Sequence, residues 1–125
     1  MNRAECIVVS GGFDPIHVGH LRMFKEASEL APKLIVIVNN DNFLIEKKGY
    51  VFMPIAERIE IIEGFNFVDM VVESVDKDLT VCETLQWLAK KENVIIFANG
   101  GDRNNTDAIP EADVCRENKI AMKFN

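Results

Sequence analysis

Two histidines three residues apart, His17 and His20, lie in the segment "SGGFDPIHVGH", directly after a strand-like run. Residues three apart fall on one side of a helix, so both imidazoles can face the same ligand. The preceding Gly11 and Gly12 carry no Cβ and let the backbone approach that ligand closely. A helix that begins near Val18 adds unpaired N–H groups and the positive end of its dipole. This combination predicts a binding site for a phosphate-bearing anion.

Simpler interpretations exist for each residue taken singly. His17 alone could cap the turn, and His20 alone could pack within the helix. Their combination with two glycines and the Asp14–Pro15 step favours a ligand site. Zinc binding by the histidine pair is disfavoured, because no third ligand lies nearby at the usual spacing. We expect Asp14 to brace the loop.

Composition predicts one globular domain over residues 1–125, with 48% hydrophobic and 27% charged residues. The formal net charge of −6 opposes non-specific binding to nucleic acid, which needs a basic surface. No apolar run approaches the roughly 20 residues that cross a bilayer. The amino-terminal residues lack the pattern of a signal peptide. We therefore expect a cytoplasmic protein with no nucleic-acid or membrane partner.

The cysteine pattern agrees with a reducing compartment. Cys6, Cys82 and Cys115 form no CxxC pair and have no histidine at metal-ligand spacing. We therefore expect free, buried or half-buried thiols instead of a disulfide or a metal site.

Short runs rich in Val and Ile alternate with helical patterns along the chain. The strand-like runs are residues 6–10, 33–40, 68–74, 94–100 and a last run, 119–124. The helical patterns cover residues 18–30, 55–65 and 79–91. Alternation of this kind predicts a three-layer α/β fold with a five-stranded, mainly parallel sheet. In such sheets ligands bind beyond the carboxyl ends of the strands.

Positive charges in this acidic chain gather after the predicted strands or at the start of the next helix. They are His17, His20, Lys47, Lys48, Arg58 and Arg103. Taken alone, Lys47 and Lys48 would form a solvated loop, and Arg58 would pair with a neighbouring glutamate on a helix surface. Their joint placement favours a site for a polyanion. We expect the Lys47–Lys48 loop to be mobile and to close over bound phosphates, because it has few apolar anchors.

The segment "GGFDPIHVGH" resembles the HxGH signature, in its fuller form GxFDxxHxGH, of the nucleotidylyltransferase superfamily. Both histidines, the glycine between them and the preceding Phe-Asp match. The resemblance implies a Rossmann-like α/β domain that joins a phosphorylated small molecule to a nucleotide and releases pyrophosphate. It further implies that His17 and His20 contact the triphosphate and stabilise the transition state.

The rest of the chain resembles the cytidylyltransferase-like branch of this superfamily. In "NNDNFLIEKKGYVFMPIAERIEII", Asp41, Lys47, Lys48 and Arg58 take the places of an aspartate after a strand, a basic loop and a helix-opening arginine. The spacing resembles glycerol-3-phosphate cytidylyltransferases, and "NGGDR" resembles the GGD loop of heptose 1-phosphate adenylyltransferases. These families end in a Ser/Thr-rich motif, and this sequence ends at "AMKFN", where that motif would begin. Three explanations stay open: a longer natural chain, a lineage without the motif, or a resemblance that does not extend to this end.

Three sets of site residues follow from the pattern and the resemblance together. The predicted catalytic residues are His17, His20, Lys47 and Arg58. The predicted nucleotide-binding residues are Ser10, Gly11, Gly12, Phe13, Asp14, His17, Gly19, His20, Lys48 and Gly100. The predicted substrate-binding residues are Asp41, Lys47, Gly101, Asp102 and Arg103. No metal ligands are predicted, and Mg²⁺ is expected to bind mainly through the triphosphate.

Asp102 and Arg103 are assigned different partners. A carboxylate is repelled by a triphosphate but accepts hydrogen bonds from hydroxyl groups. We therefore expect Asp102 to bind hydroxyls of the acceptor or of the ribose, and Arg103 to meet a phosphate or an acidic neighbour. The alternative for Asp102 is that it only braces its own turn.

The predicted reaction is direct in-line attack of the acceptor's phosphate on the α-phosphorus of CTP or ATP, which transfers CMP or AMP. Because the attacking phosphate is already an anion, Asp14 is not needed as a base. The expected acceptor is a small polyol, sugar or amino-alcohol phosphate. Two alternatives remain, a non-catalytic nucleotide-binding module and an adenylyltransferase of the nicotinate-nucleotide type. Dimers are common among the similar proteins, so a homodimer is one expected state.

Overall fold

The computed structural model describes residues 3–99 and 110–123. The strands are β1 (Glu5–Gly11), β2 (Lys33–Val38), β3 (Met70–Glu73), β4 (Asn93–Asn99) and β5 (Ala121–Lys123). The helices are α1 (Val18–Ser28), α2 (Asp41–Lys48), α3 (Ile55–Glu63), α4 (Cys82–Lys91) and α5 (Ala112–Glu117). Strands and helices alternate along most of the chain, as the sequence predicted.

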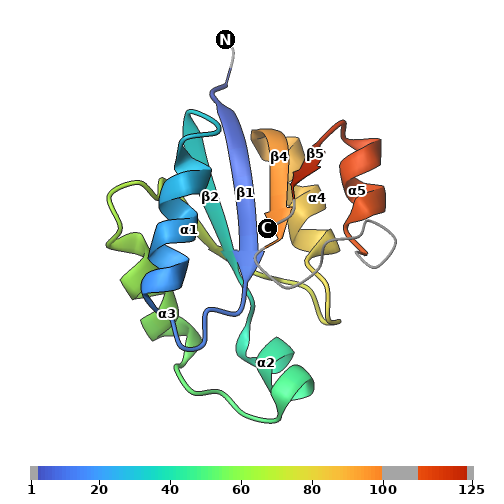
Figure 1. Ribbon diagram of the computed structural model, residues 1–125. Helices are drawn as coiled ribbons and strands as arrows, with labels where there is room; N and C mark the ends of the chain where they lie inside the picture. Colours follow the sequence, from blue (N-terminus) through green and yellow to red (C-terminus); the bar gives the residue numbers. More distant parts are fainter. Residues whose placement is uncertain (1–2, 100–109, 124–125) are drawn as a thin grey trace.

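The strands form one sheet in the order β3-β2-β1-β4-β5, and every pairing is parallel. This confirms the predicted α/β architecture. From β1 the chain first adds β2 and β3 on one side and then adds β4 and β5 on the other, as Figure 1 shows. Ser10 is in register with Ile37 of β2 and with Asn99 of β4. The carboxyl ends of these central strands therefore meet at the point where the strand order reverses, the usual place for a ligand.

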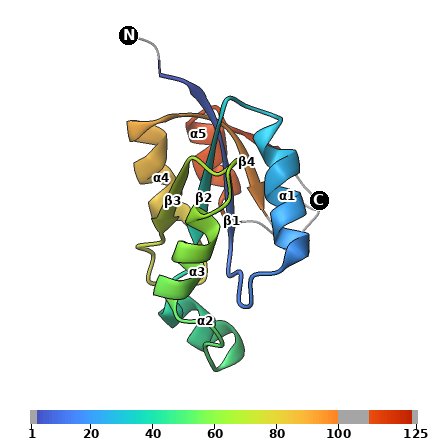
Figure 2. The ribbon, with the colours of Figure 1, turned by 90° about the vertical axis from the view of Figure 1, so that its left-hand side faces the viewer.

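Helices cover both faces of the sheet, with α1 and α3 on one face and α4 and α5 on the other (Figure 2). Successive residues of β1 alternate between the two cores, because strand side chains point to opposite faces. Ile7 and Val9 pack with Phe24 of α1, whereas Cys6 and Val8 pack with the apolar side of α4. Both faces are apolar, which explains the nearly continuous Val and Ile runs that identify the strands.

Two helices differ from the prediction. The Lys47–Lys48 segment, predicted to be a loop, belongs to helix α2, so that prediction is wrong. Only Leu44 of α2 is buried, so the helix carries no periodic apolar stripe that periodicity could detect. Helix α5 was also not predicted, because it spans six residues and buries only Cys115.

The thiols agree with the prediction: Cys6, Cys82 and Cys115 are free, and Cys6 and Cys115 are buried. Burial, together with the nearby carboxylate of Glu111, raises the pKa of Cys115 to about 12. Burial also raises the pKa of Cys6 and of Cys82. In the described part of the chain, no helix has the length and apolar character needed to cross a membrane.

Candidate active site

The loop after β1 is anchored in the core by Phe13. This residue has a positive φ of 52°, and its ring packs edge-on at 5.1 Å from both His20 and Phe24. A Cβ on Gly11 would lie 2.8 Å from the Phe13 ring, which only a glycine avoids. Phe13 therefore fixes the loop and supports one face of the His20 ring.

The two histidines are held as a stacked pair at the start of α1. Their ring centroids lie 3.9 Å apart, with an angle of 29° between the planes. Nδ1 of His17 accepts the Gly19 N–H at 3.0 Å, and Nδ1 of His20 accepts the His17 N–H at 3.2 Å. In a neutral ring with Nδ1 as acceptor, the proton resides on Nε2. Each ring therefore keeps Nε2–H as its remaining donor, on the side away from the capped backbone.

Gly19 is needed between the histidines for a steric reason. A Cβ at this position would lie 2.8 Å from Cε1 and 3.0 Å from Nδ1 of His17. The glycine in the HxGH pattern thus provides the space for the His17 ring to turn back and cap its own helix.

His20 is a neutral donor at physiological pH. Burial of its ring, followed by the neighbouring His17, lowers the pKa of His20 to about 4. The ring therefore offers a hydrogen bond near pH 7 without carrying a positive charge.

Asp14 ties this loop to the segment before α3. Its side chain is 1% exposed and forms a salt bridge with Lys48 at 2.9 Å. It also accepts the backbone N–H groups of Phe52, at 2.8 Å, and of Met53. Burial alone would raise the pKa of Asp14, but Lys48 and the two N–H donors outweigh it and lower that pKa. Asp14 braces the loop, as expected.

Arg58 lies completely buried beneath the same loop. Its Nε donates to the Met53 carbonyl at 2.8 Å, and its Nη1 donates to the carbonyls of Gly12 at 2.8 Å and Asn39 at 2.6 Å. Nη2 pairs with Asp41 at 2.6 Å. Arg58 is therefore no helix-surface ion pair, because it joins three separate segments of the site. The contacts observed give it a positioning role, and direct contact with substrate stays a prediction.

Helix α2 brings its lysines to the edge of the site, beyond the carboxyl ends of β1 and β2 (Figure 1). Asn40 caps this helix by accepting the Phe43 N–H at 2.9 Å. Lys48 contacts the first loop through Asp14 and lies 4.8 Å from the ring centroid of Tyr50. Lys47 is exposed on the last turn, with Nζ 5.7 Å from the centroid of the Phe43 ring.

The remaining predicted residues divide into two groups. Ser10 is buried at the end of β1. Gly100, Gly101, Asp102 and Arg103 lie outside the described residues, so their predicted roles stay predictions. The described part of β4 ends at Asn99, in register with Ser10.

Sequence reasoning missed Asn39. It is the first residue after β2, it is 6% exposed, and its side-chain oxygen has no hydrogen-bond partner among the described residues. Its position at the start of the polar run "NNDN" is the one signal that could have found it.

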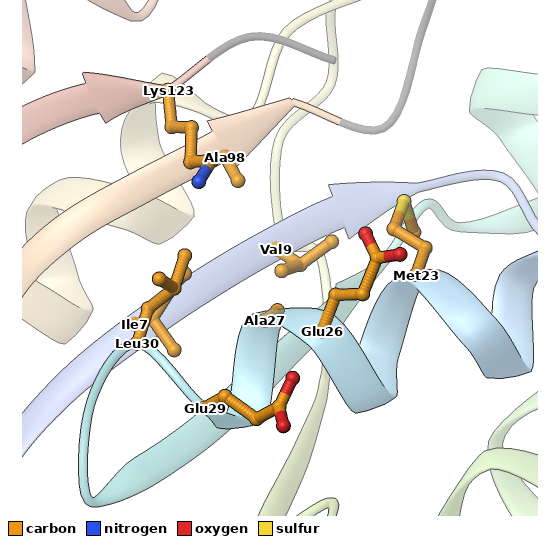
Figure 3. Close-up of a pocket in the computed structure, with 9 residues that line it drawn as sticks. All are labelled: Ile7, Val9, Met23, Glu26, Ala27, Glu29, Leu30, Ala98 and Lys123. Carbon is orange, nitrogen blue, oxygen red and sulfur yellow. The ribbon is translucent and has the colours of Figure 1, made fainter.

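A hollow of about 260 Å³ lies on the sheet face beside α1 (Figure 3). Sheet residues such as Ile7, Val9 and Ala98 form one side of it, and Ala27 of α1 and Leu30, just after α1, form the other. None of the predicted site residues lines this hollow. Within residues 3–99 and 110–123, no group of three or more His, Cys, Asp or Glu side chains could hold a metal ion.

Comparison with known proteins agrees with this geometry. The chain is 42% identical over 72 residues to a FAD synthase of Pyrococcus abyssi, which covers 57% of this chain and 49% of that protein. It is 37% identical over 101 residues to a FAD synthase of Thermococcus sibiricus, covering 78% of this chain and 64% of that protein. It is 26% identical over 101 residues to a glycerol-3-phosphate cytidylyltransferase of Bacillus subtilis, covering 77% of this chain and 70% of that protein. The matches thus span 49% and 64% of the length of these FAD synthases.

The fold also has a counterpart among solved structures. A lipopolysaccharide core biosynthesis protein from Thermoplasma volcanium superposes with a TM-score of 0.72, at 20% identity, over 97% of this chain and 93% of that one. This likeness supports the fold alone. The family described as "Cytidylyltransferase-like" matches residues 8–122, from the first strand to the last. A match of that extent, which includes the HxGH loop near its start, places this chain in the cytidylyltransferase-like family.

Proposed function

We propose that this protein transfers a nucleotidyl group from ATP or CTP to the phosphate of a small phosphorylated acceptor and releases pyrophosphate. The observation that carries the proposal is the histidine pair at the start of α1. Both Nδ1 atoms are occupied by backbone N–H groups, so both Nε2–H groups remain for a ligand. Two fixed N–H donors at the positive end of a helix suit the oxygens of a triphosphate.

The reaction needs charge stabilisation more than covalent help from the protein. The acceptor's phosphate oxygen attacks the α-phosphorus in line, the bond to the β-phosphate oxygen breaks, and pyrophosphate leaves with its electron pair. His17 and His20 donate hydrogen bonds to the phosphate oxygens as charge shifts toward the leaving group. His20 serves as a neutral donor because its pKa is lowered to about 4. The N-terminus of α1 adds positive potential at the same edge of the sheet.

The residues present fit a divalent cation that arrives with the nucleotide. The Asp14 carboxylate is already paired with Lys48 and with two backbone N–H groups. Mg²⁺, when bound, would neutralise charge on the triphosphate, held by phosphate oxygens and water. The side chains described above then orient the phosphates around it.

ATP with FMN is the first substrate pair to test. Two of the similar proteins are FAD synthases, and FMN is a polyol phosphate that carries a flat ring. Tyr50, at 58% exposure, presents its ring beside Lys48, where such a flat ring could stack, and Phe52, two residues further, is 65% exposed. CTP with glycerol 3-phosphate is the second pair, because of the likeness to a glycerol-3-phosphate cytidylyltransferase.

Pyrophosphate release is the decisive measurement. ATP and CTP should each be combined with FMN, glycerol 3-phosphate, phosphoethanolamine and nicotinate mononucleotide. We expect release that needs both substrates and Mg²⁺, and a variant with both His17→Asn and His20→Ala serves as the control for contaminating enzymes. Nucleotide binding without release in any combination would instead identify a non-catalytic binding module.

A further inference from the structure

Asn39 stands out among the buried polar side chains near the site. Its side-chain oxygen is buried and has no hydrogen-bond partner among residues 3–99 and 110–123. The neighbouring Asn40 shows the opposite pattern, since its amide donates to the carbonyls of Ser74 and Asp76 and accepts the Phe43 N–H. Buried polar groups in native proteins nearly always have partners, so the unpaired side-chain oxygen of Asn39, next to the loop after β1, indicates a missing partner.

The backbone of Asn39 is fixed from both sides. Its N–H donates to the Gly11 carbonyl at 2.9 Å, which extends the sheet ladder by one residue. Its carbonyl accepts Nη1 of Arg58 at 2.6 Å, and the same Nη1 holds the Gly12 carbonyl at 2.8 Å. The backbone of Asn39 is thus fixed against the glycines of the first loop, so its unpaired side-chain oxygen does not result from a loosely held segment.

The alternation of β2 determines the face on which Asn39 lies. Ile35 and Ile37 pack in the core beneath α4, and Asn39 follows Ile37 by two residues along the strand direction. Phe13, which contacts His20, packs in the opposite core beneath α1. Asn39 therefore lies across the edge of the sheet from the histidines.

In-line transfer requires the attacking and leaving oxygens to lie on opposite sides of the α-phosphorus. With the leaving pyrophosphate at His17 and His20, the acceptor extends away from α1, toward the face that carries Asn39. An amide both donates and accepts hydrogen bonds, and so does a hydroxyl group, whereas a phosphate oxygen only accepts. A hydroxyl therefore matches this amide in either orientation of its oxygen and nitrogen.

We propose that the side-chain amide of Asn39 binds a hydroxyl group of the acceptor and selects polyol phosphates over phosphates that lack that hydroxyl. This inference rests on the proposed function. It assigns acceptor recognition to a residue beyond those that bind the triphosphate.

The first test is Asn39→Leu, which keeps the branching at Cγ and removes the polar atoms. We expect KM for the acceptor to rise about 10-fold, the scale of one hydrogen bond to substrate, while KM for the nucleotide stays within about twofold. The melting temperature should not fall, because the substitution removes an unpaired buried oxygen. Ile37→Val alters packing on the same strand and the same face, and it should leave both KM values unchanged.

The second test changes the acceptor instead of the protein. FMN is compared with its 4′-deoxyribityl analogue, and glycerol 3-phosphate with 1,3-propanediol monophosphate. For whichever pair the wild type uses, kcat/KM should be about 10-fold higher for the hydroxylated member. Asn39→Leu should abolish this preference. Equal use of both members by the wild type, or an unchanged preference in Asn39→Leu, would overturn the inference.

Failure of the proposed function is distinguishable from failure of this inference. If the wild type releases no pyrophosphate with any pair, the proposed function fails. Calorimetric binding of FMN and of glycerol 3-phosphate then tests whether Asn39 binds the acceptor. Binding by the wild type that weakens about 10-fold in Asn39→Leu, but not in Ile37→Val, supports the assignment. Equal binding by the wild type and by Asn39→Leu refutes the assignment. Failure of the wild type to bind either compound refutes it as well.

Discussion

The backbone N–H of His17 donates to Nδ1 of His20 at 3.2 Å, while Nδ1 of His17 accepts the N–H of Gly19 at 3.0 Å. Each imidazole therefore uses one nitrogen to hold the start of α1 and keeps the other for a ligand. Folding and binding depend on different atoms of the same ring, so suitable substitutions can separate them.

His17→Asn tests that separation. Asparagine is a strong N-cap and can still accept the Gly19 N–H, but it has no group at the position of Nε2. We expect kcat to fall about 100-fold or more, the scale for one preorganised transition-state donor, with little change in melting temperature. His20→Ala should lower kcat by a similar factor. Wild-type turnover in folded His17→Asn would show that Nε2 of His17 has no role in the reaction.

Gly19→Ala should disturb the pair by steric contact alone. The added Cβ would lie 2.8 Å from Cε1 of His17, so the ring must turn out of its stack on His20. We expect kcat/KM to fall about 10-fold or more, since donor geometry governs this kind of stabilisation. Gly64→Ala, at the end of α3, is the matched control and should retain wild-type kcat/KM. If both variants retain it, the stacked arrangement is not needed for turnover.

The low pKa of His20 predicts a specific dependence of stability on pH. The unfolded chain protonates His20 near pH 6.5, but the folded protein does so only near pH 4. Between these values the unfolded state holds more protons, so the free energy of unfolding falls as the pH is lowered from 6.5 toward 4. Urea denaturation at pH 7, 6 and 5 should show this fall in the wild type and a smaller one in His20→Gln. If the free energy of unfolding changed with pH equally in the wild type and in His20→Gln, His20 would titrate normally in the folded protein.

Arg58→Lys should destabilise the fold strongly. A lysine ammonium cannot reach the carbonyls of Gly12, Asn39 and Met53 together with Asp41, so buried acceptors lose their donor. We expect the free energy of unfolding to fall by about 3 kcal/mol, measured by chemical denaturation. Arg22→Lys, on the exposed side of α1, should change it by less than about 0.5 kcal/mol. Equal free energies of unfolding for the two variants would contradict the role of the Arg58 hydrogen bonds, here called the Arg58 clamp, in holding the loop.

Thiol labelling checks the packing of the face beneath α4 and α5. Cys82 is half-buried, while Cys6 and Cys115 are buried. We expect a disulfide reagent near pH 8 to modify Cys82 slowly in the native protein and all three thiols after denaturation, and Cys82→Ser should remove the native reaction. Rapid native labelling of Cys115 would contradict its pKa of about 12.

The sheet and the first loop were predictable because their signals are local. Runs of Val and Ile mark strands buried on both faces, and the HxGH spacing fixes which side chains share the start of α1. Helix α2 was not predicted from periodicity, because it buries only Leu44 and has no periodic apolar stripe. Its ends carried the usual markers, an Asn40 cap and Gly49 with a φ of 86°, and these would have predicted the helix.

The contacts of Arg58 and Asn39 could not be predicted from the sequence. The acceptors of Arg58 come from segments that are distant along the chain and meet only when β1, β2 and the start of α3 are assembled. Nothing local distinguishes a buried arginine in a helix from an exposed one. The unpaired oxygen of Asn39 likewise becomes unusual only after its surroundings have excluded water.

The Arg58 clamp has a consequence for how the protein opens. Peeling the first loop away from the sheet would expose a buried guanidinium and release carbonyls on three segments at once. The free energy of opening the loop after β1 is therefore close to the free energy of unfolding the whole domain. In native-state hydrogen exchange, the loop and the sheet should open as one cooperative unit. The backbone amides of Gly11 and Asn39 should then exchange as slowly as those in the middle of β1, so the edge proposed to bind phosphate is already assembled before any substrate arrives.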